Sequence, residues 1–330
     1  MTEVLVLCRM LVGAAPEHRR TNIDLSMQQD RGDSMPAGKD MVEHKYADVN
    51  NIRLHYVTAG KGKLIMFLHG FPEFWYAWKN QLAEFGRDYK AVAPDMRGYN
   101  LSSKPADVEQ YRIKYLVEDI RALAEHIGQN KFILVAHDWG GGVAWPFAMR
   151  HPEYLEKLII INAPHPITFV RELRDNPAQR KASQYILVHR TFDAEDVLAR
   201  NNYAVLVSSL LKNGMKQGYF TEEDGEAYIE AWSQPGALTG ALNYYRAAHL
   251  GSFVSESDDS LSADPSLFTV RVPTLVIWGE KDRYLLKGNL EGLDRYVPTL
   301  SIRRIPDGSH WVIHEKPGLV NSYIREFIEG

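Results

Sequence analysis

Short apolar runs recur from residue 44 onward, and each has the length of one strand. Ile52, Leu54 and Tyr56 alternate with polar residues, which is the period-two pattern of a half-buried strand. Five further runs are almost continuously apolar, as strands buried on both faces are. They are KLIMFLHG (63–70), AVAP (91–94), KFILVAH (131–137), KLIIIN (157–162) and TLVIWG (274–279). The pattern therefore predicts six strands.

Segments of helical period lie between several of these strands, around residues 78–85, 115–127 and 143–150. Strands that alternate with helices form a mostly parallel sheet, because the connecting helices cover both of its faces. We therefore predict an α/β fold with a mostly parallel central sheet flanked by helices.

The alternation stops between about residues 166 and 252. This stretch is amphipathic with helical period, and the polar segment SESDDSLSADPS (255–266) leads from it towards the last apolar run. We infer a helical cap inserted over the strand ends, where open α/β sheets bind ligands. The predicted organisation is an N-terminal extension with little structure and no catalytic role (1–43), a first part of the core (44–165), the cap (166–252) and a second part of the core (253–330).

Composition excludes several classes of protein. The 330 residues carry 38 basic and 42 acidic side chains, so we expect no nucleic acid partner. Cys8 is the only cysteine, which excludes an internal disulfide and a cysteine-based zinc site and fits a reducing compartment. No apolar run reaches the ~20 residues that a membrane span needs. We expect a cytoplasmic protein, and homodimerisation stays open.

The stretch LVAHDWGGG (134–142) predicts a sharp turn from a strand into a helix. Ala136, Gly140 and Gly141 are small, as such a turn requires. Asp138 lies at its apex, where the carboxylate stands above the sheet beside the first N–H groups of the helix. The alternative is that Asp138 is an ordinary helix N-cap.

Three other loops follow predicted strands or precede the last helix and carry groups that suit catalysis. LHGFP (68–72) ends a buried strand. Asp282, in WGEKDRYL (278–285), is placed to orient a histidine, although a turn residue or a salt-bridge partner are the alternatives. His310, in PDGSHWVIHEKP (306–317), is the candidate base, and His314 ranks below it. Four loops that meet at one sheet edge favour a catalytic role for Asp138 over an N-cap.

Residues 44–330 resemble α/β-hydrolases of the epoxide hydrolase branch. The motifs that carry the resemblance are HGFPEFWYAW, DMRGYNLSSKP, VAHDWGG, NAPHP, SQPGAL, LNYYR, WGEKD and GSHW. The resemblance implies Asp138 as nucleophile, His310 as base and Asp282 as the acid that orients it. Some relatives carry this acid at the place of Asn162, so Asp282 is left as the sole acid. The family implies no metal and no cofactor.

A carboxylate nucleophile suits a saturated carbon that carries a leaving group, because displacement there gives an alkyl ester. Water activated by His310 would then hydrolyse the ester. In this family the oxyanion is stabilised by backbone N–H groups, which the resemblance assigns to Phe71 and Trp139.

An epoxide oxygen needs a proton when the ring opens, and epoxide hydrolases supply it from two cap tyrosines. The resemblance assigns Tyr245 in LNYYRA (242–247) and Tyr185 in RKASQYIL (180–187), with Tyr203 as a spare candidate. The alternative is that these tyrosines only pack the cap, as most half-buried tyrosines do.

Trp139, Phe71, Phe74 and Trp311 predict an aromatic pocket for water and a small apolar epoxide with an aryl or alkyl substituent. Core packing is the competing account for Phe74. Haloalkane and haloacetate dehalogenases are the alternative enzymes. However, the former typically carry Asn where this chain has Phe71, and the latter carry arginines where it has Trp139 and Gly142. A catalytically silent binding protein is disfavoured by the complete set of nucleophile, base and acid.

Overall fold

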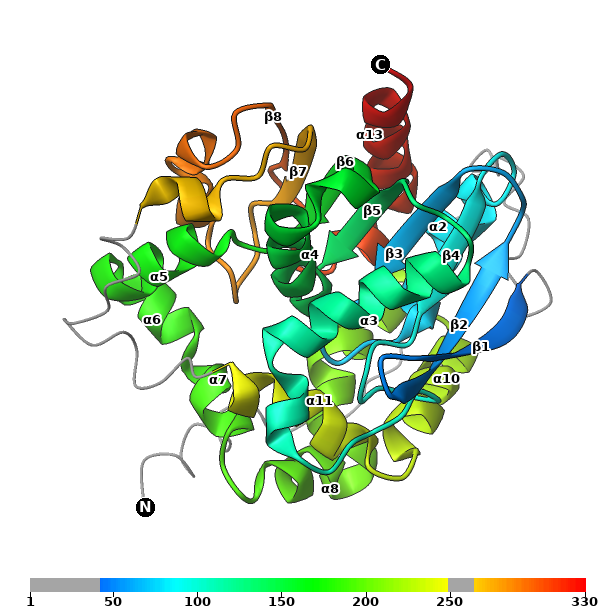
Figure 1. The fold of residues 1–330 in the computed structure, drawn as a ribbon. Helices are drawn as coiled ribbons and strands as arrows, with labels where there is room; N and C mark the ends of the chain where they lie inside the picture. Colours follow the sequence, from blue (N-terminus) through cyan, green and yellow to red (C-terminus); the bar gives the residue numbers. More distant parts are fainter. Residues whose placement is uncertain (1–41, 249–263) are drawn as a thin grey trace, which may run out of the picture. The chain divides into compact units, whose positions relative to one another are not determined.

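One sheet of eight strands forms the centre of the fold (Figure 1). The structure, a computed structural model, describes residues 42–248 and 264–330. The strand order is β1-β2-β4-β3-β5-β6-β7-β8. The strands are β1 (Glu43–Val49), β2 (Ile52–Ala59), β3 (Leu64–Leu68), β4 (Lys90–Pro94), β5 (Phe132–His137), β6 (Leu155–Ile161), β7 (Thr274–Gly279) and β8 (Leu300–Ile305). Only β1–β2 and β2–β4 pair antiparallel, so the predicted mostly parallel sheet is confirmed.

The two edge strands, β1 and β8, were not predicted from the sequence. Ala47 is the only buried residue of β1, and Ile305 is the only buried residue of β8. An edge strand with so little buried surface needs no apolar run, so its sequence resembles that of a loop. The six predicted strands are all present, as β2 to β7.

Helices pack on the sheet in two pairs. Helix α3 (Ile113–His126) contacts α4 (Trp139–Arg150), and α2 (Lys79–Phe85) contacts α13 (Pro317–Glu329). Helix α3 buries Leu116, Val117, Ile120, Leu123 and Ala124, whose spacing of three and four residues places them on one face. In Figure 1, α3 and α4 cover the near face of the strands.

The segment between β6 and β7 is helical, as expected of a cap. It contains α5 (Pro166–Asp175), α6 (Pro177–Ala182), α7 (Gln184–His189), α8 (Ala194–Leu206), α9 (Lys212–Gln217), α10 (Glu222–Ser233) and α11 (Ala237–Ala247). Helix α8 is interrupted at residues 200–203, where the backbone is not helical. Among the described residues 166–248 there is no strand. None of the helices in the described ranges is long and apolar enough to cross a membrane.

Two predicted segments lie mostly outside the described residues. They are the extension at 1–43, although β1 already begins at Glu43, and the polar linker at 255–266.

Hydrogen bonds fasten the cap to loops of the core. The Trp232 indole N–H of α10 donates to the Pro72 carbonyl oxygen at 2.6 Å. The Tyr244 hydroxyl of α11 donates to the Arg97 carbonyl oxygen at 2.9 Å. Both acceptors lie in loops that follow strands of the core, so the cap is held at that edge of the sheet.

Candidate active site

Asp138 occupies the turn between β5 and α4 in an unusual backbone conformation. Its φ is 49° and its ψ is −121°, a combination that costs free energy for any residue with a side chain and is often found at functional sites. The side chain makes no hydrogen bond to the start of α4. Its Oδ1 instead accepts the backbone N–H of Phe71 at 2.8 Å. The N-cap alternative is therefore wrong.

Two glycines allow the loop after β3 to approach this turn. A Cβ at Gly70 would lie 2.3 Å from Asp138 Cβ, and one at Gly140 would lie 2.2 Å from the Leu68 carbonyl oxygen. Atoms cannot approach this closely without displacement, so both positions require glycine. The next peptide bond along, Phe71–Pro72, is cis. The Phe71 N–H reaches Asp138 because no side chain stands between the two loops.

His310 lies between two carboxylates. Its Nδ1 is 2.7 Å from Asp282 Oδ2, and its Nε2 is 3.5 Å from Asp138 Oδ2. Asp282 follows β7, and its Oδ1 accepts the backbone N–H groups of Tyr284 at 2.8 Å and Leu285 at 2.9 Å. The structure therefore brings together the predicted nucleophile, base and acid from three separate loops.

The charges in this triad stabilise a protonated histidine. Burial alone would lower the pKa of His310, but the negative charges of Asp282 and Asp138 outweigh it and raise the pKa to about 10. Burial likewise would raise the pKa of Asp138, and His310 holds it below its ordinary value. At neutral pH the site thus contains an imidazolium between two carboxylates.

His314 belongs to a different buried cluster. Its Nε2 is 2.6 Å from Oε1 of Glu73, which also accepts the Tyr228 hydroxyl at 2.8 Å. Although burial opposes it, the charges and hydrogen bonds of His314 and His137 hold the pKa of Glu73 well below its usual range. His137 Nε2 lies 2.9 Å from the His310 carbonyl oxygen, so this cluster supports the histidine loop. Of the two candidate histidines, His310 is the one that faces Asp138.

Asn162 holds the acid of the triad in place. Its Nδ2 donates to Asp282 Oδ2 at 2.8 Å, and its Oδ1 accepts the Gly279 N–H at 2.9 Å. The residue follows β6 with a φ of 41°. Sequence reasoning treated Asn162 only as the absence of a second acid, and the hydrogen bond could be found only from the structure.

The two predicted tyrosines of the cap lie together. The Tyr245 ring, from α11, is 5.3 Å from the Phe71 ring, 5.1 Å from the Trp139 ring and 6.1 Å from the Tyr185 ring, measured between centroids. Burial raises the pKa of both tyrosines well above the usual value, and the charge of Asp138 adds to this. Both hydroxyls therefore stay protonated at neutral pH. The spare candidate Tyr203 contacts the Trp232 ring instead.

Two further aromatic side chains of this group were not predicted. The Tyr284 ring is 5.4 Å from Tyr185 and 5.3 Å from His310. The His189 ring is 4.7 Å from Phe71. His189 lies four residues after Tyr185 on α7, and residues with this spacing share a helix face, so helical periodicity could have indicated it. Tyr284 offers no comparable signal, because it lies in an irregular loop.

Two of the predicted substrate-binding residues, Trp311 and Phe74, have different surroundings. Trp311 packs against His310 with ring centroids 4.8 Å apart, and its indole N–H donates to the Ser209 carbonyl oxygen at 3.0 Å. Phe74 packs on Trp75, Tyr76 and Tyr228, which is the arrangement that the core-packing account expects.

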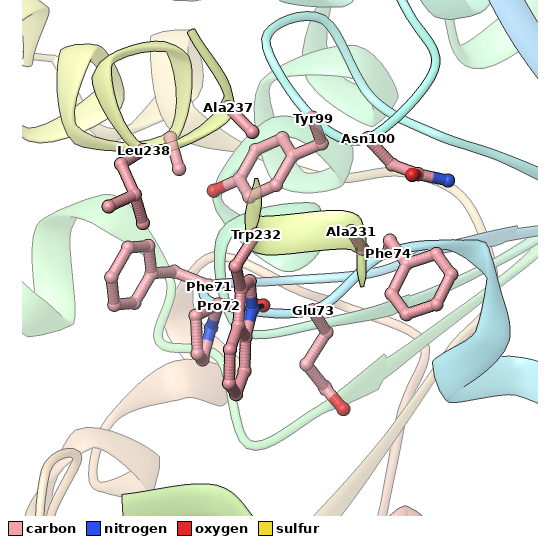
Figure 2. A pocket seen from close by; sticks show the side chains of 11 residues that line it. Phe71, Pro72, Glu73, Phe74, Tyr99, Asn100, Ala231, Trp232, Ala237 and Leu238 are labelled. Carbon is pink, nitrogen blue, oxygen red and sulfur yellow. Dashed lines mark hydrogen bonds between the residues drawn. The ribbon is translucent and has the colours of Figure 1, made fainter. Parts of the chain in front are cut away.

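A pocket between the loop after β3 and helices α10 and α11 is lined by both Phe71 and Phe74. They lie on opposite sides of it, and Trp232 and Tyr99 stand between them (Figure 2).

The sequence profile of the alpha/beta hydrolase fold matches residues 63–317. The chain belongs to the α/β-hydrolase fold family. It is 41% identical to the AB hydrolase superfamily protein YfhM of Bacillus subtilis over 88% of this chain and 99% of that protein. It is 37% identical to epoxide hydrolase 4 of Mus musculus over 87% of this chain and 79% of that protein.

Solved structures of this α/β-hydrolase family include an epoxide hydrolase from Bacillus megaterium in complex with an inhibitor. It superposes with a TM-score of 0.80 and 39% identity, over 87% of this chain and 100% of that one. A variant of an epoxide hydrolase from the same organism, complexed with its product, a naphthyloxy-propanediol, gives a TM-score of 0.81 and 41% identity over the same shares of the two chains. The resemblance of the sequence to the epoxide hydrolase branch is confirmed.

Proposed function

We propose that this protein is an epoxide hydrolase that converts an epoxide and water into a vicinal diol through an ester on Asp138. The observation that carries the proposal is the placement of this carboxylate. Its Oδ1 accepts the Phe71 N–H at 2.8 Å, and its Oδ2 faces His310 at 3.5 Å. A carboxylate held by an oxyanion donor on one side and a base on the other is equipped both to form an ester and to hydrolyse it. Relatives named as epoxide hydrolases support the same activity.

In the first step, Oδ2 of Asp138 attacks a carbon of the epoxide ring. The bond from this carbon to the ring oxygen breaks, and Tyr245 or Tyr185 donates its phenolic proton to that oxygen. The products are a hydroxyalkyl ester of Asp138 and a phenolate. Since Oδ1 stays on the Phe71 N–H, it becomes the carbonyl oxygen of the ester.

In the second step, water attacks the ester carbon, and the negative charge that develops on Oδ1 is stabilised by the Phe71 N–H and, we infer, by the Trp139 N–H. Trp139 begins α4, so its N–H is one of those without an acceptor inside the helix. His310 first passes its proton through solvent to the phenolate, and then takes a proton from the attacking water. The bond from the ester carbon to the alkoxy oxygen then breaks, His310 gives its proton to that oxygen, and the diol leaves. The carboxylic acid of Asp138 finally passes its proton to His310, which restores the resting carboxylate and imidazolium. No metal or cofactor takes part.

The proposed substrate is a small apolar epoxide with an aryl or alkyl substituent. Phe71, Trp139, Tyr185 and Tyr245 surround the nucleophile with aromatic surface, and no arginine or lysine contacts Asp138 among the described residues. A carboxylate-bearing substrate would therefore lack a partner for its charge. The naphthyl group of the product bound to the Bacillus megaterium relative supports an aryl substituent.

The first test is diol formation from styrene oxide by the purified protein. We expect Asp138→Ala to abolish turnover, and we expect Tyr245→Phe and Tyr185→Phe each to lower the rate of ring opening about a hundredfold or more, because general acid catalysis has this magnitude. Tyr203→Phe is the matched control and should retain wild-type activity. In His310→Gln the ester should accumulate and add the mass of styrene oxide to the peptide that contains Asp138.

Other outcomes would identify a different function. Halide release from haloalkanes or haloacetates, without diol and unaffected by Tyr245→Phe, would indicate a dehalogenase with the same nucleophile. Binding of epoxides without turnover by the wild-type protein would indicate a binding protein.

A further inference from the structure

His189 is a polar side chain in an otherwise aromatic part of the candidate active site. Its ring lies 4.7 Å from Phe71, 4.7 Å from Tyr245 and 5.5 Å from Tyr185, between centroids. Phe71 donates to the nucleophile Asp138, and the two tyrosines are the proposed proton donors. His189 therefore borders the space in which an epoxide would react.

One nitrogen of this ring has no partner. His189 Nδ1 is inaccessible to solvent and makes no hydrogen bond within the described parts of the chain. Buried polar atoms are almost always hydrogen-bonded, and one left unpaired costs free energy. Trp139, Tyr185 and His189 nevertheless each keep part of their surface accessible. An unpaired polar atom beside a ligand site is explained if the ligand supplies the partner.

The charge state of His189 suits recognition of a neutral group. Burial lowers the pKa of His189 to about 4, although the charge of Asp138 opposes this. At neutral pH the imidazole is therefore uncharged and has one N–H donor and one acceptor nitrogen. An uncharged donor can pair with an ether or hydroxyl oxygen, whereas it would not attract an anionic substrate.

We propose that His189 is a specificity-determining residue that hydrogen-bonds an ether or hydroxyl oxygen on the first substituent carbon of the epoxide. The favoured substrates are then glycidyl ethers and related oxygen-bearing epoxides, ahead of purely hydrocarbon ones. The distances between rings are the reason for placing the recognised oxygen on the first substituent carbon. His189 packs directly on Phe71 and Tyr245, which flank the reacting ring, so it is within reach of atoms one or two bonds away from that ring. This inference rests on the proposed epoxide hydrolase activity and deepens it.

The test compares phenyl glycidyl ether with its carbon analogue, in which a methylene group replaces the ether oxygen. For each protein the ratio of kcat/KM for the two substrates is measured, and ratios are compared between proteins, so that the intrinsic reactivities of the substrates cancel. We expect His189→Phe to lower the ratio about tenfold, as for loss of one hydrogen bond to a neutral group. The ratio should fall because kcat/KM for the ether substrate falls, while kcat/KM for the carbon analogue changes by about twofold or less. His189→Gln keeps a donor and should retain most of the ratio.

Two further variants serve as a replacement and a control. His189→Leu replaces His189→Phe if the latter does not fold, as judged by thermal unfolding. His126→Phe, on the exposed surface of α3, should leave the ratio unchanged.

The inference is overturned if His189→Phe leaves the ratio within about twofold of wild type, a change below that expected from one hydrogen bond. It is also overturned if both substrates slow equally, since that result assigns His189 to packing. Turnover of the carbon analogue by wild type separates these failures from failure of the proposed function. If wild type opens neither epoxide, the proposed function fails and this inference fails with it.

Discussion

Removal of the negative charge on Asp138, without a change of shape, should make His310 a base at neutral pH. In the resting site two carboxylates raise the pKa of His310 to about 10, against the opposing effect of burial. Asp138→Asn removes one of these charges and keeps the side chain's size. The second carboxylate, Asp282, remains 2.7 Å from Nδ1 and continues to favour the imidazolium. The pKa should therefore fall, but not to the value of an unpaired buried histidine.

The distance sets the size of this change. Two unit charges 3.5 Å apart, as for His310 Nε2 and Asp138 Oδ2, interact by about 5 kcal/mol at an effective dielectric constant of about 20. Since one pKa unit corresponds to about 1.4 kcal/mol, the pKa of His310 should fall by about three. Esterification of Asp138 removes the same charge during catalysis. The reaction itself would then convert His310 from a stable imidazolium into the base that the second step requires.

The assay is a titration of the histidine ring signals by nuclear magnetic resonance. The chain has 12 histidines, so the His310 signals are assigned from their absence in His310→Gln. Mass spectrometry confirms that the amide at position 138 stays intact. Asp307→Asn is the matched control, because this exposed carboxylate pairs with Lys316 and its charge is screened by solvent. If His310 in Asp138→Asn remains protonated above about pH 9, the charge-coupling argument is refuted.

Three other substitutions test the support around the site. Gly70→Ala would place its Cβ 2.3 Å from Asp138 Cβ, so we expect kcat/KM for styrene oxide to fall about a hundredfold, the effect of an ångström-scale displacement; an effect below fivefold would contradict this. Asn162→Ala removes the 2.8 Å hydrogen bond to the triad acid and should lower the free energy of unfolding in urea by about 2 kcal/mol, with a matching fall in kcat. Tyr228→Phe removes the 2.8 Å hydrogen bond to buried Glu73 and should lower the same free energy by about 1.5–3 kcal/mol; an unchanged denaturation midpoint would show that this bond contributes nothing.

The order of the catalytic residues and strands along the chain was enough to predict much of the candidate site. In a mostly parallel sheet the loops after the strands gather at one edge, so Asp138 and Asp282 could be expected near each other from sequence alone. Local composition was sufficient for the turn at Asp138, because only small residues fit beside it. The same holds for the five strands β3 to β7, whose apolar runs are required by burial on both faces.

Only the tertiary structure decided which side chains touch. Asn162 bonds to Asp282, and His189 packs on Phe71, across separations of more than 100 residues in sequence. Periodicity and spacing describe one element at a time and do not fix which side chains of different elements touch. The strands and the turn were therefore set by local physical requirements that can be read along the chain. The hydrogen bond from Asn162 to Asp282 and the position of His189 among the aromatic rings were set by how the cap and the strand-end loops pack together.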